Sequence, residues 1–333
     1  MDPVRVVFLG SPQFAVPSLE SLIVSDAIDV SLVVTQPDRP SGRGRKLQPP
    51  PVKLSAQSHA IATIQPETLK DEQVLDRLRT LDPDVLVIVS YGEILRRDVL
   101  ELPKFGCLNV HPSLLPSYRG SIPIQATILN GDPDAGISII RLVRRMDAGP
   151  ILSQTRVPLT GEETAGSLSQ HLAQKAGELL PDVIIDWVRG VIKETPQDEY
   201  KATYCRELTK SDAQIDWRWS ADYIERFVRA MSPWPRAWTV AGDNRLSIDA
   251  VSLSRDREQQ DVNAAPGQVF RDGQRVRVAA GDGMLALGTV QPAGKKSMQA
   301  ADWIRGLQAS DSIRFGSPDK DRPPLVFTQN QKS

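Results

Sequence analysis

The feature that most constrains this chain is the regular alternation of β-branched runs with helical patterns between residues 4 and 189. The strand candidates are Val4–Gly10, Val30–Gln36, Val85–Tyr91, Leu108–His111 and Ile137–Leu142. Two segments, 69–81 and 165–188, place apolar residues three and four positions apart, as amphipathic helices do. The alternation predicts an α/β domain with a Rossmann-like, doubly wound and mostly parallel sheet covered by helices.

The sequence changes character after residue 189. It becomes polar and includes Thr195–Glu199, a composition typical of a linker. A helical stretch, 221–230, then precedes short alternating segments at 245–253 and 275–280 that are separated by glycines, which predicts a small OB-like β-barrel. A chain of 333 residues is long enough for two domains. The expected division is a catalytic domain, a linker and a C-terminal barrel over 1–189, 190–208 and 209–333.

Charge and cysteine content narrow the classes of function. The net charge is -1, so any nucleic-acid surface must be local. From residue 263 to the end, 10 Lys and Arg exceed 6 Asp and Glu by 4, the sign that RNA binding needs. Two cysteines and three histidines suggest neither a disulfide framework nor a metal site, and a reducing setting follows. Without a signal peptide or an apolar span, we expect a cytoplasmic protein with no membrane partner.

Two polar side chains leave the strand candidate 108–111 together. Side chains alternate across a strand, so Asn109 and His111 share one face. Pro112 cannot donate to a sheet ladder and marks the strand's end, where open parallel sheets gather their ligand sites. On spacing alone, two polar residues that close a strand and bond to nearby backbone explain the pattern equally well.

A carboxylate follows the strand candidate 137–142. Asp147 lies in Met146–Pro150, where a Gly-Pro pair predicts a turn, and such an Asp more often bonds to its own backbone than acts in catalysis. Together, however, an amide donor, an imidazole and a carboxylate at strand ends suit an acyl-transfer site without a covalent nucleophile.

A long basic loop directly follows the second strand candidate. Residues 36–46 contain Arg39, Arg43, Arg45 and Lys46 against a single aspartate, and their Gly and Pro content predicts irregular structure. Most short basic loops are simply solvated. Because this loop leaves the sheet beside the expected ligand edge, we expect a phosphate-contacting arm with Arg43 as the foremost contact.

These segments together resemble the methionyl-tRNA formyltransferase family. In the first domain the similar segments are Phe8–Ala15, Gln36–Pro40, Val89–Gly92, Asn109–Pro116 and Met146–Gly149. In the second they are Ile215–Trp217, Pro233–Pro235 and Leu287–Lys296. The resemblance covers nearly the whole chain, and the combination is specific although single motifs are shared with other folate-dependent formyltransferases. Pro112 departs from the glycine more often expected there and removes an N–H.

The resemblance implies a formyltransferase fold and transfer of a formyl group from 10-formyltetrahydrofolate, a co-substrate, to the methionine amine of initiator methionyl-tRNA. The residues that match the family's catalytic positions are Asn109, His111 and Asp147. Those expected to bind folate are Ser113, Leu114, Leu115 and Pro116, with Ser90, Tyr91, Gly92 and Leu95 lining the pterin pocket. Those expected to bind tRNA are Arg39, Arg43, Arg45, Lys46, Lys295 and Lys296. No metal is required, and we expect a monomer.

The implied reaction needs positioning and electrostatics rather than covalent catalysis. The methionine amine would attack the formyl carbon while Asn109 and His111 donate to the developing oxyanion. Asp147 would orient or tune His111 and help, directly or through water, to take the amine's proton.

Three rival classes are weaker. A dinucleotide-binding enzyme lacks its fingerprint, because the first strand is followed by Gly10–Phe14 rather than a glycine-rich turn. A folate-dependent formyltransferase acting on a small amine, such as a purine precursor or a nucleotide sugar, needs neither the second domain nor the basic loop, although sugar formyltransferases also carry extra domains. A non-catalytic tRNA-binding protein has no need for Asn109, His111 and Asp147 together.

Overall fold

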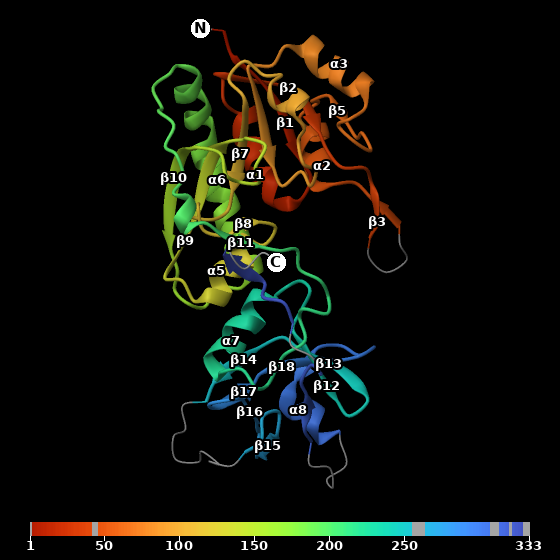
Figure 1. Ribbon diagram of the computed structural model, residues 1–333. Coiled ribbons are helices and arrows are strands. Elements are labelled where there is room, and N and C mark those ends of the chain that lie inside the picture. The colour runs from red at the N-terminus through yellow and green to blue at the C-terminus, as the bar shows by residue number, and fades with distance from the viewer. Residues whose placement is uncertain (1, 42–45, 255–263, 307–312, 320–321, 329–333) are drawn as a thin grey trace.

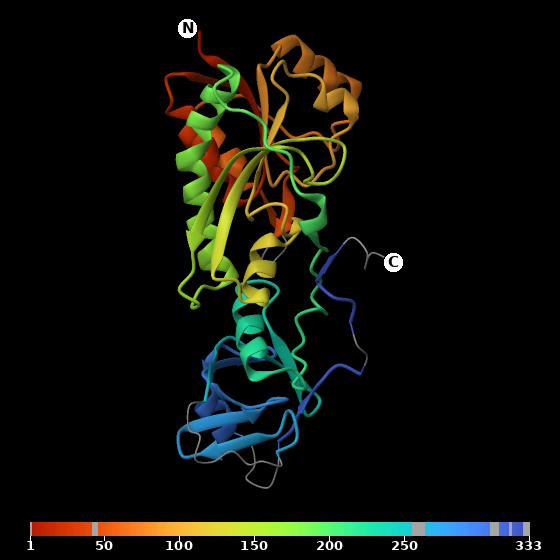
Figure 2. The ribbon, with the colours of Figure 1, turned by 60° about the vertical axis from the view of Figure 1, so that its left-hand side comes forward.

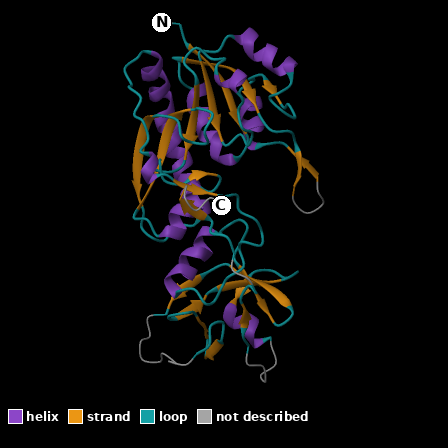
Figure 3. Cartoon of the chain, in the orientation of Figure 1, coloured by secondary structure: helices purple, strands orange, loops and turns teal. Residues whose placement is uncertain are grey.

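The computed structural model describes residues 2–41, 46–254, 264–306, 313–319 and 322–328. These residues form two domains, which lie one above the other in Figure 1 and remain distinct in the turned view of Figure 2. The upper domain combines a large sheet with helices, and the lower one consists mainly of strands (Figure 3). No helix in the described ranges is long and apolar enough to cross a membrane.

The upper domain is built on a seven-stranded sheet with the order β10-β9-β7-β6-β1-β2-β5. Its strands are β1 (Val4–Gly10), β2 (Ile28–Val34), β5 (Thr63–Ile64), β6 (Val85–Val89), β7 (Cys107–His111), β9 (Asp134–Arg141) and β10 (Ile151–Pro158). The first five pair in parallel, whereas β9 runs antiparallel to both β7 and β10. The expected mostly parallel sheet is therefore confirmed.

Both faces of this sheet are covered, because successive side chains of a strand point to opposite sides. Val6 and Phe8 of β1 join a core with α1 (Val16–Ile23), α2 (Pro51–Ser58) and α6 (Ala165–Val188), and Val7 and Leu9 join another with α3 (Glu72–Leu81) and α4 (Arg97–Leu100). Burial on both sides explains why the strands read as continuous apolar runs rather than as alternating ones.

Long helices agree with the sequence-based expectation, but the short ones were not expected. Helix α6 has the predicted bounds, and its N-cap Thr164 accepts from the Ser167 N–H. Helices α1, α2 and α5 (Pro123–Asn130) each span 8 residues and begin with a proline in the first turn. Eight residues are too few to establish a helical period, so only the proline signal was available.

The lower domain consists of antiparallel strands with helices α7 (Ala221–Ala230) and α8 (Ala300–Arg305). The strands are β12 (Trp238–Ala241), β13 (Asn244–Ile248), β14 (Val251–Leu253), β15 (Val269–Asp272), β16 (Arg275–Ala279), β17 (Met284–Leu287), β18 (Thr289–Pro292), β19 (Met298–Gln299) and β20 (Phe315–Gly316). They form a five-stranded sheet, β19-β18-β13-β12-β20, and a four-stranded sheet, β14-β17-β16-β15.

One bent hairpin connects these two sheets. The segment expected as a single strand, 245–253, divides at residues 249–250 into β13 and β14. Strand β13 pairs with β18 in one sheet, and β14 pairs with β17 in the other. Because the same hairpin crosses between the sheets, their inner faces enclose one core, as the expected barrel requires.

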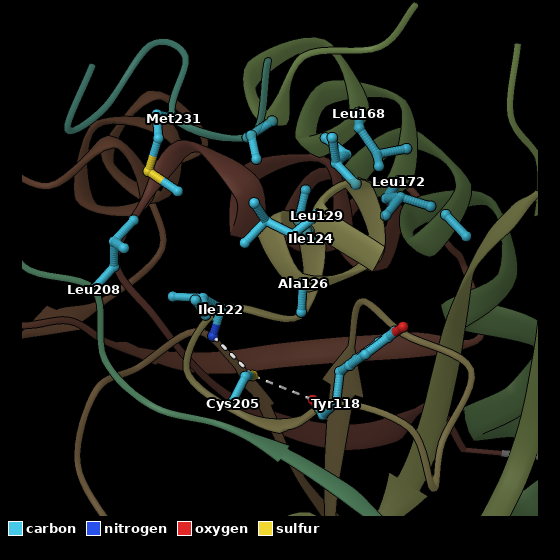
Figure 4. Packing of buried hydrophobic residues seen from close by; sticks show 14 of the residues in the cluster. Tyr118, Ile122, Ile124, Ala126, Leu129, Leu168, Leu172, Cys205, Leu208 and Met231 are labelled. Atoms are coloured by element: carbon cyan, nitrogen blue, oxygen red, sulfur yellow. Dashed lines mark hydrogen bonds between the residues drawn. The ribbon is translucent and has the colours of Figure 1, made fainter. Parts of the chain in front are cut away.

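The two domains share a hydrophobic core. Helix α5 of the upper domain packs against α7 of the lower one, and residues of both belong to one buried cluster. Figure 4 shows Leu129, Leu168 and Met231 among its members. Arg226 of α7 also donates through Nε to the carbonyl oxygen of Leu129 at 3.1 Å. The contact is therefore a packed interface and not a loose tether.

The segment between the domains is docked as well. Thr195 exchanges two backbone hydrogen bonds with Ile151 of β10, and β11 (Thr203–Cys205) pairs with β8 (Arg119–Gly120). The late strand β21 (Val326–Thr328) returns from the lower domain to pair with the other side of β11. The expected bounds of the catalytic domain, the linker and the barrel, 1–189, 190–208 and 209–333, remain a prediction. Despite its polar composition, the segment 190–208 is docked on the upper domain and is not a free linker.

Candidate active site

The carboxyl ends of the parallel strands meet at one edge of the upper sheet. Strands β7, β6, β1 and β2 are consecutive neighbours there, so the segments that follow them lie side by side. With strands about 4.8 Å apart, the end of β7 is about 14 Å from the end of β2. This edge brings together the polar strand, the expected pterin loop and the basic segment.

Asn109 and His111 emerge from β7 as its spacing predicts. Asn109 lies between Ile88 of β6 and Ile140 of β9 and is half-buried. Within the described ranges its carboxamide has no hydrogen-bond partner, so the group is available to a ligand. His111 is 4% exposed, which removes most of its ring from solvent.

The orientation of His111 is set by a strained neighbour. Its Nε2 lies 2.9 Å from the carbonyl oxygen of Tyr118, and because a carbonyl only accepts, Nε2 carries a proton. Tyr118 has a φ of 62°, an uncommon value for a bulky residue. Its N–H donates to Thr203 Oγ1 at 2.8 Å and its hydroxyl to Asp132 Oδ2 at 2.6 Å, contacts that hold this conformation.

Asp147 faces the other nitrogen of the same ring. Its Oδ2 lies 3.7 Å from His111 Nδ1 and accepts the Gly120 N–H at 2.8 Å. Asp147 has a φ of 49°, which an aspartate tolerates better than most residues. The structure therefore brings the turn residue and the two β7 residues together, as proposed from the sequence. A separation of 3.7 Å leaves His111 Nδ1 and the carboxylate without a direct hydrogen bond.

Gly120 is a site residue that sequence reasoning missed. It has a φ of 113°, and a Cβ at this position would overlap the carbonyl oxygen of Cys205. Only glycine lets its N–H approach Asp147 while β8 stays paired with β11. A glycine in Arg119–Gly120 was visible in the sequence, but nothing in its spacing linked it to Asp147.

The expected pterin loop follows β6 at the same edge. Ser90 and Gly92 are exposed and have positive φ values of 51° and 92°. Tyr91 and Leu95 instead point into the core, at 2% and 9% exposure. These two buried side chains therefore hold the loop, and the exposed surface consists of Ser90 and the backbone around Gly92.

The expected folate motif after β7 is largely internal. Ser113 is fully buried and donates to the carbonyl oxygen of Ser117 at 2.6 Å. Leu115, which is 3% exposed, donates from its N–H to Ser138 Oγ at 3.1 Å, while Leu114 and Pro116 are half-buried. The described contacts of Ser113 and Leu115 are thus with protein and fix the shape of the segment.

The basic segment after β2 is a hairpin at its base, so the expectation of irregular structure was wrong there. Strand β3 (Arg39–Ser41) pairs with β4 (Lys46–Gln48), and the hairpin projects from the upper domain in Figure 1. Asp38 anchors it through Lys53 Nζ at 2.9 Å. Arg39 and Lys46 are exposed, as are Lys295 and Lys296 in the turn between β18 and β19. Arg43 and Arg45 lie outside the described residues.

Metal and thiol chemistry find little support at this edge. Within the described ranges, no three His, Cys, Asp or Glu side chains gather as a metal site would require. Cys107 and Cys205 are free and buried, and burial raises the pKa of each thiol to about 12. A thiolate nucleophile is therefore disfavoured at neutral pH.

Two family profiles match the chain. Residues 4–184 match the Formyl transferase family, and residues 207–308 match the Formyl transferase C-terminal domain. The described sheet edge with Asn109, His111 and Asp147 lies within the first of these.

Curated relatives are similar over nearly the full length. The methionyl-tRNA formyltransferase of Roseiflexus sp. (strain RS-1) is 46% identical over 314 residues, covering 94% of this chain and 96% of its own. That of Roseiflexus castenholzii is 45% identical over 312 residues, covering 94% and 99%. Among solved structures, an N-formyltransferase from Helicobacter canadensis, in complex with folinic acid and dTDP-3-aminofucose, gives a TM-score of 0.64 at 16% identity. The match covers 87% of this chain and 99% of that one, a likeness of fold alone.

Proposed function

The chain belongs to the methionyl-tRNA formyltransferase family, and from that membership we propose that Asn109, His111 and Asp147 carry out formyl transfer at the described sheet edge. The enzyme is a folate-dependent formyltransferase whose co-substrate is 10-formyltetrahydrofolate, and its acceptor is the methionine amine of methionyl-tRNA. One observation carries the proposal: an unbonded amide, an oriented imidazole and an anchored carboxylate meet beside β7.

Asn109 supplies the oxyanion donor. Attack of the amine on the formyl carbon develops negative charge on the formyl oxygen, and a donor already aimed at that oxygen lowers the barrier. The Asn109 carboxamide has two N–H donors and no partner within the described ranges. It therefore needs to break no protein hydrogen bond before it meets the oxygen.

We propose that the role of His111 depends on its protonation. Because Nε2 donates to the Tyr118 carbonyl, a neutral ring has a lone pair at Nδ1 and donates to an oxyanion only after gaining a second proton. Two acceptors, Nδ1 and Asp147 Oδ2, then lie 3.7 Å apart, a separation at which one attacking amine nitrogen can donate to both. We assign the pair the task of orienting the amine and taking its proton, with donation by His111 following that transfer.

The folate would be held by the two segments that end β6 and β7. The exposed backbone around Gly92 offers N–H and C=O groups for the edges of a pterin, while Tyr91 and Leu95 give the loop a rigid apolar support. A Cβ at Gly92 would meet no atom within 4 Å, so this backbone is open to a ligand. Ser113 and Leu115 would act by shaping the neighbouring turn.

The tRNA would contact the basic hairpin and the second domain. Arg39 and Lys46 on the hairpin, and Lys295 and Lys296 beyond β18, are exposed cations that suit phosphates. The alternative acceptor is a nucleotide sugar, but its support is weaker. The sugar enzyme shares the fold at 16% sequence identity, whereas a methionyl-tRNA formyltransferase is 46% identical. We also propose that the acceptor is the initiator form of methionyl-tRNA and that the protein is cytoplasmic and monomeric. Light scattering in solution tests the monomeric state.

Isotope transfer tests the reaction, and Asn109→Ala tests the site. The wild-type protein should move labelled formyl from 10-formyltetrahydrofolate to charged initiator tRNA, and more slowly to the elongator form. Asn109→Ala should lower the single-turnover rate by about 10² to 10³ with saturating tRNA, because one preorganised oxyanion donor is lost. A variant that loses affinity but keeps the wild-type rate would contradict this role. Transfer of the label to a nucleotide sugar instead of tRNA would contradict the proposed acceptor.

A further inference from the structure

We infer that Gln197, in the segment between the domains, is a positioning residue for formyl transfer, because its carboxamide holds the turn that carries Asp147. The inference rests on the proposed function of Asp147. It adds a residue outside the matched catalytic positions and outside both matched profiles, which cover 4–184 and 207–308.

The amide nitrogen of Gln197 binds the backbone of the turn that carries Asp147. Its Nε2 donates to the carbonyl oxygens of Asp147, at 2.7 Å, and Gly149, at 2.6 Å. Both N–H groups of the amide are thereby used on backbone that flanks the Asp147 side chain. Since Asp147 has a φ of 49°, the turn needs such external contacts to keep this conformation.

The other end of Gln197 is itself fixed. Its Oε1 accepts from Arg119, at 3.1 Å from Nε and 2.8 Å from Nη2. Arg119 is fully buried and also donates to Glu199 and to the Tyr204 hydroxyl. Hydrogen bonding to Arg119 lowers the pKa of the Glu199 carboxyl to about 2, so this partner stays charged at neutral pH.

Arg119 precedes Gly120, whose N–H donates to Asp147 Oδ2. The Asp147 turn is therefore held at two points by one assembly: Gly120 binds the carboxylate and Gln197 binds the backbone. If the Gln197 contact is lost, the carboxylate can move relative to His111 Nδ1 while both side chains remain present. A displacement of about 1 Å can cost on the order of 10²-fold in rate.

Two variants of the full-length chain separate positioning from stability. In Gln197→Glu a carboxylate still accepts from Arg119, but no N–H remains for the carbonyl oxygens of Asp147 and Gly149. In the matched control, Asp198→Asn, the neighbouring exposed carboxylate loses its charge and its ion pair with Lys201, while no described contact of Gln197, Arg119 or residues 145–149 is touched. The control should keep kcat and the melting temperature close to wild type, because an exposed ion pair contributes little to stability.

Gln197→Glu should instead slow the reaction. We expect kcat to fall about ten- to a hundredfold, with KM for both substrates close to wild type. The melting temperature should fall as well, because the new carboxylate faces the carbonyl oxygens of Asp147 and Gly149 without a donor. The Gly120 amide proton reports on Asp147 without any turnover, because it is bonded to the carboxylate. Labelling with ¹⁵N-glycine and carbonyl-¹³C arginine selects the four glycines that follow an arginine, at positions 44, 120, 190 and 306. Of these, Asp147→Asn identifies Gly120 as the one that it shifts. That signal should move in Gln197→Glu and stay in Asp198→Asn.

The inference requires that Gln197→Glu both lowers kcat and moves the Gly120 signal. A wild-type kcat, or an unmoved Gly120 signal, overturns the inference, and a loss confined to KM or melting temperature assigns Gln197 a structural role only. If the wild-type protein transfers no formyl group, the proposed function fails, and the Gly120 signal still decides whether Gln197 positions Asp147.

Discussion

At the scale of single residues, Asp147 has both a structural and a chemical role. Its backbone takes a left-handed turn conformation, while its side chain binds the Gly120 N–H and faces His111. The sequence presented these as competing explanations, a turn former or a catalytic carboxylate. In the structure they coincide, because the left-handed turn directs the carboxylate toward the ring.

Asp147→Asn separates the charge from the turn. Asparagine tolerates a positive φ and its Oδ1 can still accept from Gly120, so the fold and melting temperature should be kept. The amide cannot take a proton from the amine, so kcat should fall by about 10² to 10⁴. Single-turnover formylation and a thermal melt measure the two effects. Parallel losses of stability and rate would identify Asp147 as a turn former alone.

At the scale of elements, the sequence predicted what local periodicity determines. Helix α6 was predicted with its bounds because 24 residues repeat the apolar spacing many times. The base of the basic hairpin was missed, because β3 and β4 have 3 residues each and their ladder depends on cross-strand pairing. Docking of 190–208 was missed for a similar reason: its contacts are with residues distant in sequence.

The same distinction applies to the candidate site. Asn109 and His111 share a face because strand alternation requires it, so the sequence sufficed. Tyr118 and Gly120 act through a backbone carbonyl and a backbone N–H, and residue type says little about where such groups point. Gln197 lies 50 residues from Asp147, a pairing that only the folded chain creates.

The hairpin carries the prediction that belongs to this scale. Lys53 compensates the charge of Asp38, so neither exposed cation of the hairpin is needed for that task. Arg39 donates only to the neutral Gln36 side chain, at 3.3 Å, and we expect Arg39 and Lys46 to contact phosphate. Replacing either cation with alanine should raise KM for charged tRNA and leave KM for formyl-folate unchanged. Each loss should also flatten the log-log salt dependence of tRNA binding by at most about one unit.

Lys175→Ala provides the control for these variants. Lys175 is half-buried on α6 and pairs with Glu178 at 2.7 Å, so it offers a charge of the same sign on a different element. Its replacement should leave the tRNA salt dependence as in the wild type. If Lys175→Ala and the hairpin variants change that dependence equally, the effect comes from overall charge and the hairpin is not a contact surface.

At the scale of the whole molecule, the two domains share more than a covalent connection. One buried cluster runs from the sheet of the upper domain through α5 and α7 into the lower domain. Figure 4 shows two of its members, Leu129 on α5 and Met231 directly after α7. Strand β21 also returns to β11, which pairs with the strand that contains Gly120. Because apolar burial and strand pairing both cross the boundary, unfolding one domain exposes surface of the other.

The last prediction is that the protein unfolds in one cooperative transition, and Leu129→Ala tests it. Leu129 lies on α5 at 4% exposure, so its truncation should reduce the free energy of unfolding by about 2 to 5 kcal/mol.

Two spectroscopic signals report on the two domains. Five of the six tryptophans lie beyond residue 208, so fluorescence reports mainly on the lower domain. Far-ultraviolet circular dichroism is dominated by upper-domain helices such as α6. A shared core requires both signals to shift together in denaturant, although the substitution is confined to the upper domain. Ile23→Ala, on α1 and remote from α7, serves as a second upper-domain variant and should likewise shift both signals. If circular dichroism shifts while fluorescence does not, the domains unfold independently, and the α5–α7 contact is a docked interface rather than part of one core.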